Sequence, residues 1–183
     1  MEVKKYRFSP IQSKKELLDA ITYIHIECNK LCKESFNMYL PNAGNMTVCC
    51  HYEDEFAFLT ELRKELTVSS NNPDQKFFLL HKPITIAKVN GIPETTYRYL
   101  YIRRPREDTS EVGNIDFYLE VEEYQKIKGS LIKGEIIRGA RIYNRKDLDM
   151  IELYDPAVDV LGYVSTPAMT ERVRVKQSDE TIL

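Results

Sequence analysis

The spacing of apolar residues changes along the chain, from a helical repeat near the N-terminus to strand-like alternation after residue 76. Ser13 and Glu16 form an S-x-x-E capping box, which is typical of a helix start. Apolar residues then recur every three or four positions, at Leu17, Ile21, Ile24, Cys28, Leu31 and Cys32. This spacing predicts an amphipathic helix that continues to about Tyr39 and is ended by Pro41 and Gly44.

A second helix is predicted over residues 53–66. Its apolar stripe consists of Phe56, Leu59, Leu62 and Leu66. Three acidic residues at 53–55 occupy its first turn, where negative charge favours a helix N-terminus. A short apolar segment before it, residues 46–50, is a candidate strand, and residues 69–75 form a polar loop.

The second half of the chain has the period of strands. Strands are expected near residues 76–81, 84–88, 97–104, 115–120, 137–145, 149–154 and 160–165, with a further candidate at 172–176. One helix interrupts them at 121–132, with Tyr124, Ile127 and Leu131 on its inward face. We therefore predict an α+β fold, in which an N-terminal helical portion packs on a mixed or antiparallel sheet that has one further helix in its C-terminal half.

The length of the chain, 183 residues, fits a single domain, with a mainly helical portion at 1–75 and a sheet-rich portion at 76–183. The formal net charge of −2 argues against general nucleic-acid binding, which needs a basic excess. The longest apolar runs span only a few residues, and the N-terminal segment lacks the apolar stretch of a secretion signal. We expect a cytoplasmic protein without a membrane partner.

All four cysteines fall in the first 50 residues, at Cys28, Cys32, Cys49 and Cys50. Together with His25 and His51 they offer zinc-binding atoms, and either histidine could activate a cysteine nucleophile. The spacing fits no common zinc pattern, however, and two of the cysteines occupy the apolar stripe of the first helix. Buried, reduced structural thiols are therefore favoured.

His51, Glu53 and Glu55 form an H-x-E-x-E run, which we interpret as charges at a helix start. We expect no metal ion and no cofactor.

Arginine and tyrosine share one face of several predicted strands. Because side chains in a strand alternate between two faces, Tyr97, Tyr99, Tyr101 and Arg103 lie together, as do Arg141, Tyr143 and Arg145, and Arg172, Arg174 and Lys176. Guanidinium groups match carboxylates and phosphates, and tyrosine offers a flat face with a polar tip. We predict ligand binding by Arg103, Arg141 and Arg145 as charge clamps, with Tyr99, Tyr101 and Tyr143 as stacking or hydroxyl contacts. The order of the strands decides whether these groups converge or instead pair with acidic strands.

Carboxylates form a second candidate site. Asp147 and Asp149 share one face of an extended segment, Glu152 lies on the opposite face, and such oxygen ligands suit a divalent cation. The neighbouring predicted strand, however, carries Arg141 and Arg145, so ion pairs between strands are favoured over a metal site.

The stretch from Gly113 to Thr166 runs strand, helix and then three strands, and it contains an Asp155-Pro156 turn before the last strand. This order resembles one βαβββ module of the vicinal oxygen chelate superfamily, the glyoxalase and dioxygenase group. The resemblance implies a fold with a cupped pocket. The family's turn continues Asp-Pro-Asp-Gly-Asn, which this chain does not follow, and the metal-binding glutamate of the last strand would fall at Gly162 or Tyr163. The metal ligand is thus absent, and residues 1–75 show no second module.

Two functional hypotheses follow from these patterns. The first is a small binding module that recognises an anionic ligand, such as a nucleotide, a phosphorylated metabolite or an acidic protein segment, on the arginine and tyrosine face. The alternative is an enzyme, either related to the vicinal oxygen chelate group or a metal-dependent hydrolase that uses Asp147, Asp149 and Glu152. A structural component that docks on another protein is a third possibility.

Overall fold

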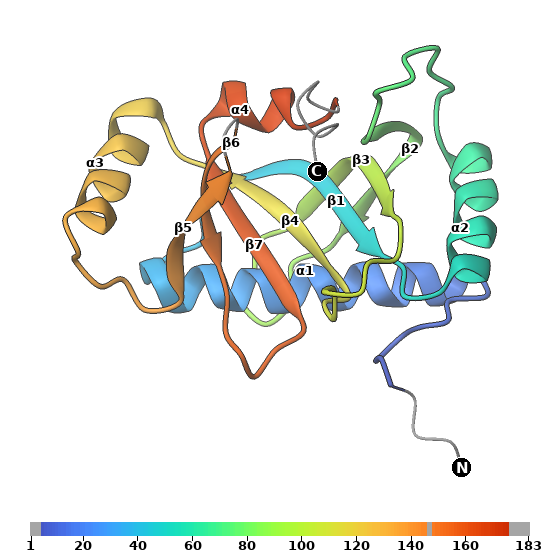
Figure 1. Cartoon of the computed structure of the whole chain (residues 1–183), viewed down its shortest axis with the longest axis horizontal. Helices are drawn as coiled ribbons and strands as arrows, with labels where there is room; N and C mark the ends of the chain where they lie inside the picture. Colours follow the sequence, from blue (N-terminus) through green and yellow to red (C-terminus); the bar gives the residue numbers. More distant parts are fainter. Residues whose placement is uncertain (1–4, 146–147, 176–183) are drawn as a thin grey trace.

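The computed structural model of the protein describes residues 5–145 and 148–175, which form four helices and seven strands. In chain order these are α1 (Lys14–Phe36), β1 (Asn42–Cys49), α2 (Glu53–Leu66), β2 (Phe78–Ile86), β3 (Thr95–Arg103), β4 (Gly113–Tyr118), α3 (Val121–Ile132), β5 (Ala140–Arg145), β6 (Leu148–Leu153), β7 (Val160–Ser165) and α4 (Pro167–Arg172). The strands form one mixed sheet with the order β2-β3-β1-β4-β7-β6-β5 (Figure 1). The predicted α+β fold is confirmed.

Two predicted strand assignments differ from the structure. The segments 76–81 and 84–88 belong to a single strand, β2, whose pairing with β3 is irregular between Leu79 and Ile84. The candidate strand at 172–176 is wrong, because α4 extends to Arg172 and Val175 forms only an isolated bridge with Gln75. Thr166 caps this helix and a proline occupies its first turn, both strong helix-start signals. Lys176 lies outside the described residues.

The sheet consists of two halves with related topology. In the second half, β4 to β7, the first and last strands are parallel neighbours and α3 follows the first strand. This is the βαβββ arrangement predicted for residues 113–166. The first half, β1–α2–β2–β3, repeats it with one strand fewer, since β1 lies parallel to β3 and α2 follows β1. The sequence analysis found no second module in residues 1–75; the related unit begins there, with β1 and α2, and is completed by β2 and β3 beyond residue 75. Six of the eight residues of β1 are buried, so the strand lacks the alternation that reveals a half-exposed strand.

The two halves meet at an antiparallel pair of strands, β1 and β4, in the middle of the sheet. Met46 lies opposite Ile115, Thr47 opposite Asn114, and Val48 opposite Gly113. Because side chains alternate along each strand, Met46 and Ile115 join the hydrophobic core on one side of the sheet. Thr47 and Asn114 face the other side.

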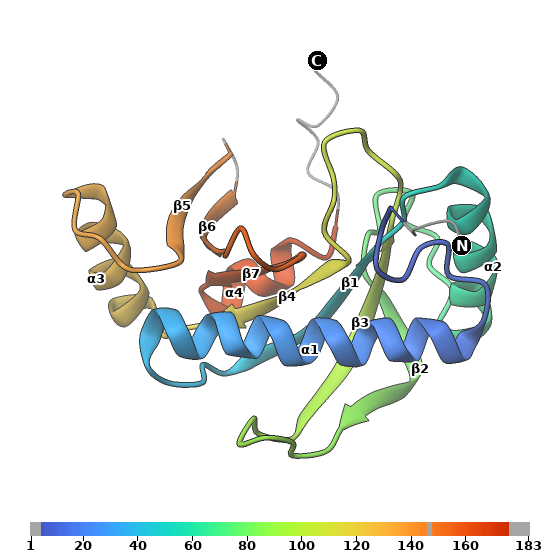
Figure 2. The ribbon, with the colours of Figure 1, turned by 90° about the horizontal axis from the view of Figure 1, so that it is seen from below.

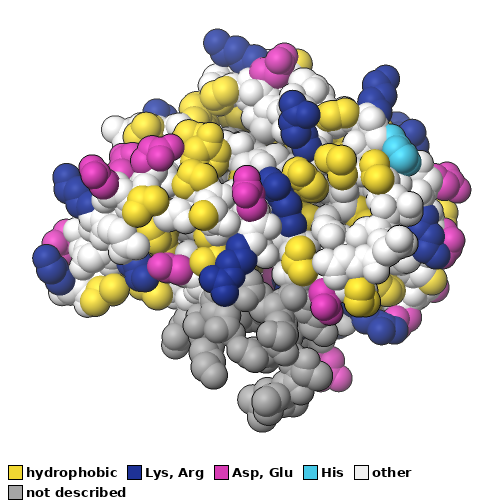
Figure 3. All heavy atoms as spheres, turned by 90° about the horizontal axis from the view of Figure 1, so that it is seen from above, with side chains coloured by type: hydrophobic (Ala, Val, Ile, Leu, Met, Phe, Trp, Pro, Cys, Tyr) yellow, Lys and Arg dark blue, Asp and Glu magenta, His cyan; other side chains and the backbone are white. Residues whose placement is uncertain are grey.

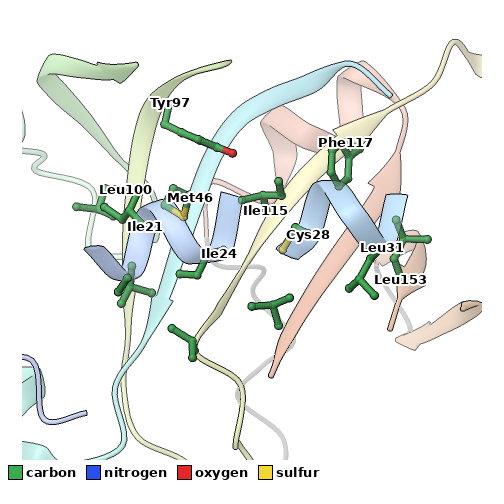
Figure 4. Packing of buried hydrophobic residues seen from close by; sticks show 14 of the residues in the cluster. Ile21, Ile24, Cys28, Leu31, Met46, Tyr97, Leu100, Ile115, Phe117 and Leu153 are labelled. Atoms are coloured by element: carbon green, nitrogen blue, oxygen red, sulfur yellow. The ribbon is translucent and has the colours of Figure 1, made fainter. Parts of the chain in front are cut away.

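Three helices cover the core side, which we call the outer face. Helix α1 contacts strands of both halves, while α2 packs on β2 and β3 and α3 packs on β5. Figure 2 shows α1 running between α2 at one end of the molecule and α3 at the other. The buried face of α1 carries Leu17, Ile21, Ile24, Cys28, Leu31 and Cys32, the stripe that the sequence predicted (Figure 4).

The opposite side of the sheet, the inner face, has a second and smaller hydrophobic cluster. Phe77, Met150 and Val173 are its buried members, and several tyrosines pack around them. Only the short helix α4 contacts this face, at β1 and β4, among the helices described. Most of the inner face is therefore left for a pocket. No described helix is both long and apolar enough to cross a membrane.

Gly113 occupies the point where α1 crosses the junction between the halves. A Cβ atom added here would lie 2.1 Å from the carbonyl oxygen of Thr47 and 2.6 Å from Cδ1 of Ile24. Because one of these atoms belongs to the backbone of β1, the contact cannot be relieved by a rotamer change.

We predict that Gly113→Ala lowers the free energy of unfolding by roughly 3 kcal/mol, because the methyl group forces β1, β4 and α1 apart. Gly129→Ala is the matched control, since a Cβ there meets nothing within 4 Å and the residue lies inside α3. That variant should gain about 0.5–1 kcal/mol from higher helix propensity. Urea denaturation followed by circular dichroism measures both changes, and equal stability of the two variants would contradict the packing described.

Candidate functional site

A pocket of about 280 Å³ opens on the inner face, across the junction of the two halves. The first half contributes Thr47, Tyr101 and Arg103 to its walls, and the second half contributes Asp116, Tyr143 and Tyr163. Of the six ligand-binding residues predicted from the sequence, the structure brings three together here: Arg103, Tyr101 and Tyr143.

Aromatic rings form much of the pocket wall. Tyr143 and Tyr163 make an edge-to-face pair with ring centroids 5.1 Å apart, and Phe77 packs on Tyr101 at 5.3 Å. Such walls favour a flat apolar ligand body. Burial, reinforced by nearby Tyr143 and Glu152, raises the pKa of Tyr163 far above the physiological range. Tyr163 thus remains a neutral phenol that can donate or accept a hydrogen bond.

Arg103 brings a partly buried positive charge to one end of the pocket. It is the last residue of β3, and its side chain is only 20% exposed. Its ion pair with Glu111 measures 3.5 Å, longer than a good N–H···O hydrogen bond. Burial opposes the charge, but Cys49 and Glu111 outweigh that cost and raise the pKa of Arg103. The guanidinium is therefore charged at any physiological pH.

Further basic residues surround this end of the pocket, at Lys76, Arg104 and Arg106. Arg104 pairs with Glu53 at 3.1 Å, and Arg106 pairs with Asp108 at 3.2 Å. Both pairs are exposed to solvent, so they are screened and hold their guanidinium groups weakly. Arg103 is consequently the cation whose position the fold fixes most firmly.

The other three predicted binding residues lie differently. Arg141 donates from Nε to Oε1 of Glu152 at 2.7 Å and lies over the ring of Tyr154, away from the pocket walls. This is the pairing between strands that the sequence analysis weighed against a ligand site. Tyr99 packs on the inner-face cluster, but the guanidinium of Arg174 covers its ring at 3.8 Å. Arg145 ends β5, and its side chain lies outside the described residues.

Asp116 is a pocket residue that is not among the six binding residues predicted from the sequence. It lies on β4, is 3% exposed, and accepts a hydrogen bond from Nδ2 of Asn45 at 2.7 Å. Asn45 in turn accepts from Nε of Arg174 at 3.0 Å. Burial raises the pKa of Asp116 to about 6. The available sequence signal was one acidic residue between Ile115 and Phe117 in an apolar strand, and this does not reveal a pocket.

Of the three carboxylates proposed for a metal site, the two that the structure describes, Asp149 and Glu152, lie on opposite faces of the sheet. Asp149 faces the outer side, where it accepts from Tyr124 at 2.8 Å and from Lys128 at 2.6 Å. Glu152 lies on the opposite face with Arg141, as the alternation predicted, and Asp147 lies outside the described residues. Asp149 and Glu152 therefore cannot bind one metal ion together.

The residues on the inner face do not fit the metal ion that the vicinal oxygen chelate resemblance implies. Tyr163, at one of the two positions corresponding to the family's glutamate, is a neutral phenol in the pocket wall. The nearby carboxylates have separate partners, since Asp116 accepts from Asn45 and Glu152 is neutralised by Arg141. Within residues 5–145 and 148–175, no group of three or more histidine, cysteine or acidic side chains lies close enough to hold a metal ion.

The cysteines and His25 belong to the core. All four thiols are buried and free, as predicted, and burial raises the pKa of Cys32 to about 11 and that of Cys49 to about 12. His25 hydrogen-bonds the hydroxyl of Tyr97 at 2.8 Å, and burial lowers its pKa to about 4. Protonated thiols and a neutral buried imidazole are typical of packing residues, not of an activated nucleophile.

Comparisons with known proteins support the fold and leave the function open. The chain matches no protein-family model, and it matches no curated protein. It is similar in structure to a structural-genomics protein named Protein EC4020, with a TM-score of 0.56 and 11% sequence identity over 94% of this chain and 99% of that one. At this identity the likeness concerns the fold alone.

More distant structural resemblance links the chain to methylmalonyl-CoA epimerase, a member of the vicinal oxygen chelate superfamily. A Streptomyces coelicolor epimerase variant in complex with 2-nitronate-propionyl-CoA has a TM-score of 0.34 and 19% identity, over 71% of this chain and 97% of that one. An epimerase in complex with methylmalonyl-CoA and NH4+ has a TM-score of 0.31 at the same identity and coverage. These values describe a distant likeness and carry nothing about the ligand of this chain.

The buried carboxyl of Asp116 predicts an unusual pH dependence of stability. Its folded pKa of about 6 lies above the ordinary value of 3.8, so folding favours the protonated form, and stability is lost as the pH rises through 6. Asp116→Asn removes the free-energy cost of burying this ionised carboxylate. The variant should be more stable than the wild type at pH 8 by about 2–3 kcal/mol, and the difference should disappear near pH 4.

Asp149→Asn provides the matched control, because Lys128 and Tyr124 outweigh the cost of burial and lower the pKa of Asp149. That carboxylate stabilises the fold at neutral pH, and its contribution is lost as the pH falls through its folded pKa. Thermal unfolding of the three proteins between pH 4 and pH 8 should show opposite trends for the two variants. Parallel curves would contradict the environment described for Asp116.

Proposed function

We propose that the protein binds a small organic anion with a flat apolar body, in the pocket between the two halves of the sheet. The observation that carries this proposal is the position of Arg103 at one end of a pocket whose walls are aromatic. Tyr101 comes from the first half and Tyr143 and Tyr163 from the second, so a ligand would contact both.

The charge of the ligand follows from the state of Arg103. A guanidinium that is 20% exposed has lost most of its hydration, and its recorded partner, Glu111, lies at 3.5 Å. A carboxylate or phosphate oxygen at hydrogen-bond distance compensates this cost better, since the planar fork of arginine binds such groups with two parallel bonds. The basic residues around it attract an anion toward the same end of the pocket.

The size of the pocket selects among the ligand classes considered for this chain. A volume of about 280 Å³ lies just below the roughly 300–1,000 Å³ typical of ligand sites. A compact metabolite therefore suits it better than an acidic protein segment, which needs an open groove.

Across the described part of the face in Figure 3, basic and acidic side chains are intermixed, which offers no basic tract for a nucleic acid. Four free, buried thiols suit a cytoplasmic location, which remains part of this proposal.

We predict that 3-phenylpropionate, which combines one carboxylate with one aromatic ring, binds the wild-type protein, and that Arg103→Gln weakens it at least ~10-fold, the loss expected for a charge-assisted hydrogen bond. Ligand-observed NMR titration measures both affinities. The matched control is Arg98→Gln, which removes an arginine from the same strand at an exposed position outside the pocket. It should leave the affinity unchanged.

Two outcomes would contradict the proposal. In the first, the wild-type protein shows no binding of the probe at millimolar concentration. In the second, both arginine variants lose affinity equally, which indicates general charge attraction and no defined contact with Arg103. A folded Arg103→Gln protein, checked by circular dichroism, makes the comparison valid.

A further inference from the structure

The pocket carries opposite charges at its two ends. Arg103 pairs with Cys49 in the register of β1 and β3, whereas Asp116 hydrogen-bonds Asn45 on the same strand β1. Asn45 and Cys49 are four residues apart, which corresponds to about 13 Å along a strand. A ligand anchored at Arg103 by its anionic group would therefore direct its far end toward a carboxyl group.

The hydrogen bonds of Asp116 leave it with acceptor capacity. Its Oδ2 receives the Nδ2–H of Asn45, and no second donor to this carboxylate is recorded among residues 5–145 and 148–175. A carboxylate has about four acceptor positions. Asp116 is almost completely buried and lines the pocket, so the pocket is where a further donor can reach it.

The surroundings of Asn45 hold this carboxylate in one orientation. The amide oxygen of Asn45 accepts from Arg174 at 3.0 Å, and its amide nitrogen donates to the carbonyl of Thr170 at 2.9 Å as well as to Asp116. Asn45 is fully buried, so its amide cannot turn without losing all three contacts. Arg174 itself lies over the ring of Tyr99, which fixes the guanidinium. The contacts of Asn45 and Arg174 thus hold the carboxylate of Asp116 in a fixed position in the pocket wall.

We propose that Asp116 recognises a hydrogen-bond donor, a hydroxyl or an amine, at the end of the ligand opposite its anionic group. The ligand class is then a compact organic anion with a donor at its far end, such as a hydroxyaryl or aminoaryl carboxylate. This inference rests on the function proposed above, and it adds the chemistry of the second end. An anionic pocket wall would repel a ligand that is negative at both ends, so a dianion such as a dicarboxylate is disfavoured.

Three probes of nearly equal size test the role of Asp116: 3-phenylpropionate, 3-(4-methylphenyl)propionate and 3-(4-hydroxyphenyl)propionate. The wild-type protein should bind the hydroxyl probe about 10-fold more tightly than the methyl probe, the preference that one hydrogen bond to a charged acceptor provides. Asp116→Asn should reduce this preference for the hydroxyl probe to below about threefold. Isothermal titration calorimetry at pH 8, where Asp116 is ionised, measures each affinity.

The outcomes separate this inference from the function on which it rests. If the wild-type protein binds the hydroxyl and methyl probes equally, or if Asp116→Asn retains the full preference, the role of Asp116 is overturned while anion binding at Arg103 stands. If no probe binds, the proposed function fails and the inference fails with it. The comparison of probes on the wild-type protein needs no variant, so it does not depend on how Asp116→Asn folds.

Discussion

The pairing of β1 with β4 is the constraint on which the rest of the structure depends. It joins two halves of related topology into one sheet, and it leaves room for α1 only because Gly113 has no side chain. The same pairing places Thr47 beside Asn114 and Asn45 beside Asp116 on the opposite face. The hydrophobic core and the pocket thus lie on opposite faces of the same pair of strands.

The two halves of the sheet contribute opposite charges to the pocket. The first half of the sheet supplies the partly buried guanidinium of Arg103, and the second half supplies the buried carboxyl of Asp116. Neither half alone contains both charges, and the tyrosines between them also come from both sides. Because both side chains are mostly removed from solvent, each charge acts through a lower effective dielectric than it would at the surface. The recognition chemistry we propose therefore exists only when the halves are joined.

Local sequence patterns predicted the individual elements well, since helices 53–66 and 121–132 and the strand 160–165 have the predicted bounds. What they could not supply was strand order, because contacts between distant strands leave no local period. Tyr101 and Tyr143 line the same pocket although 42 positions separate them, whereas Arg141 is neutralised by Glu152 on the adjacent strand. β1 was underestimated for a related reason: burial on both faces removes the alternation that identifies a strand.

Helix α1 extends over 23 residues, or about 35 Å, and contacts strands on both sides of the junction. Because it packs on β1 as well as on β4, β6 and β7, it opposes a hinge motion of the two halves about the β1–β4 pair. For the binding proposed here, selectivity would then come from a pocket whose shape exists before the ligand arrives. Such a site loses little conformational entropy on binding, and its rate of association is set by access through an open mouth, with no closing motion to wait for.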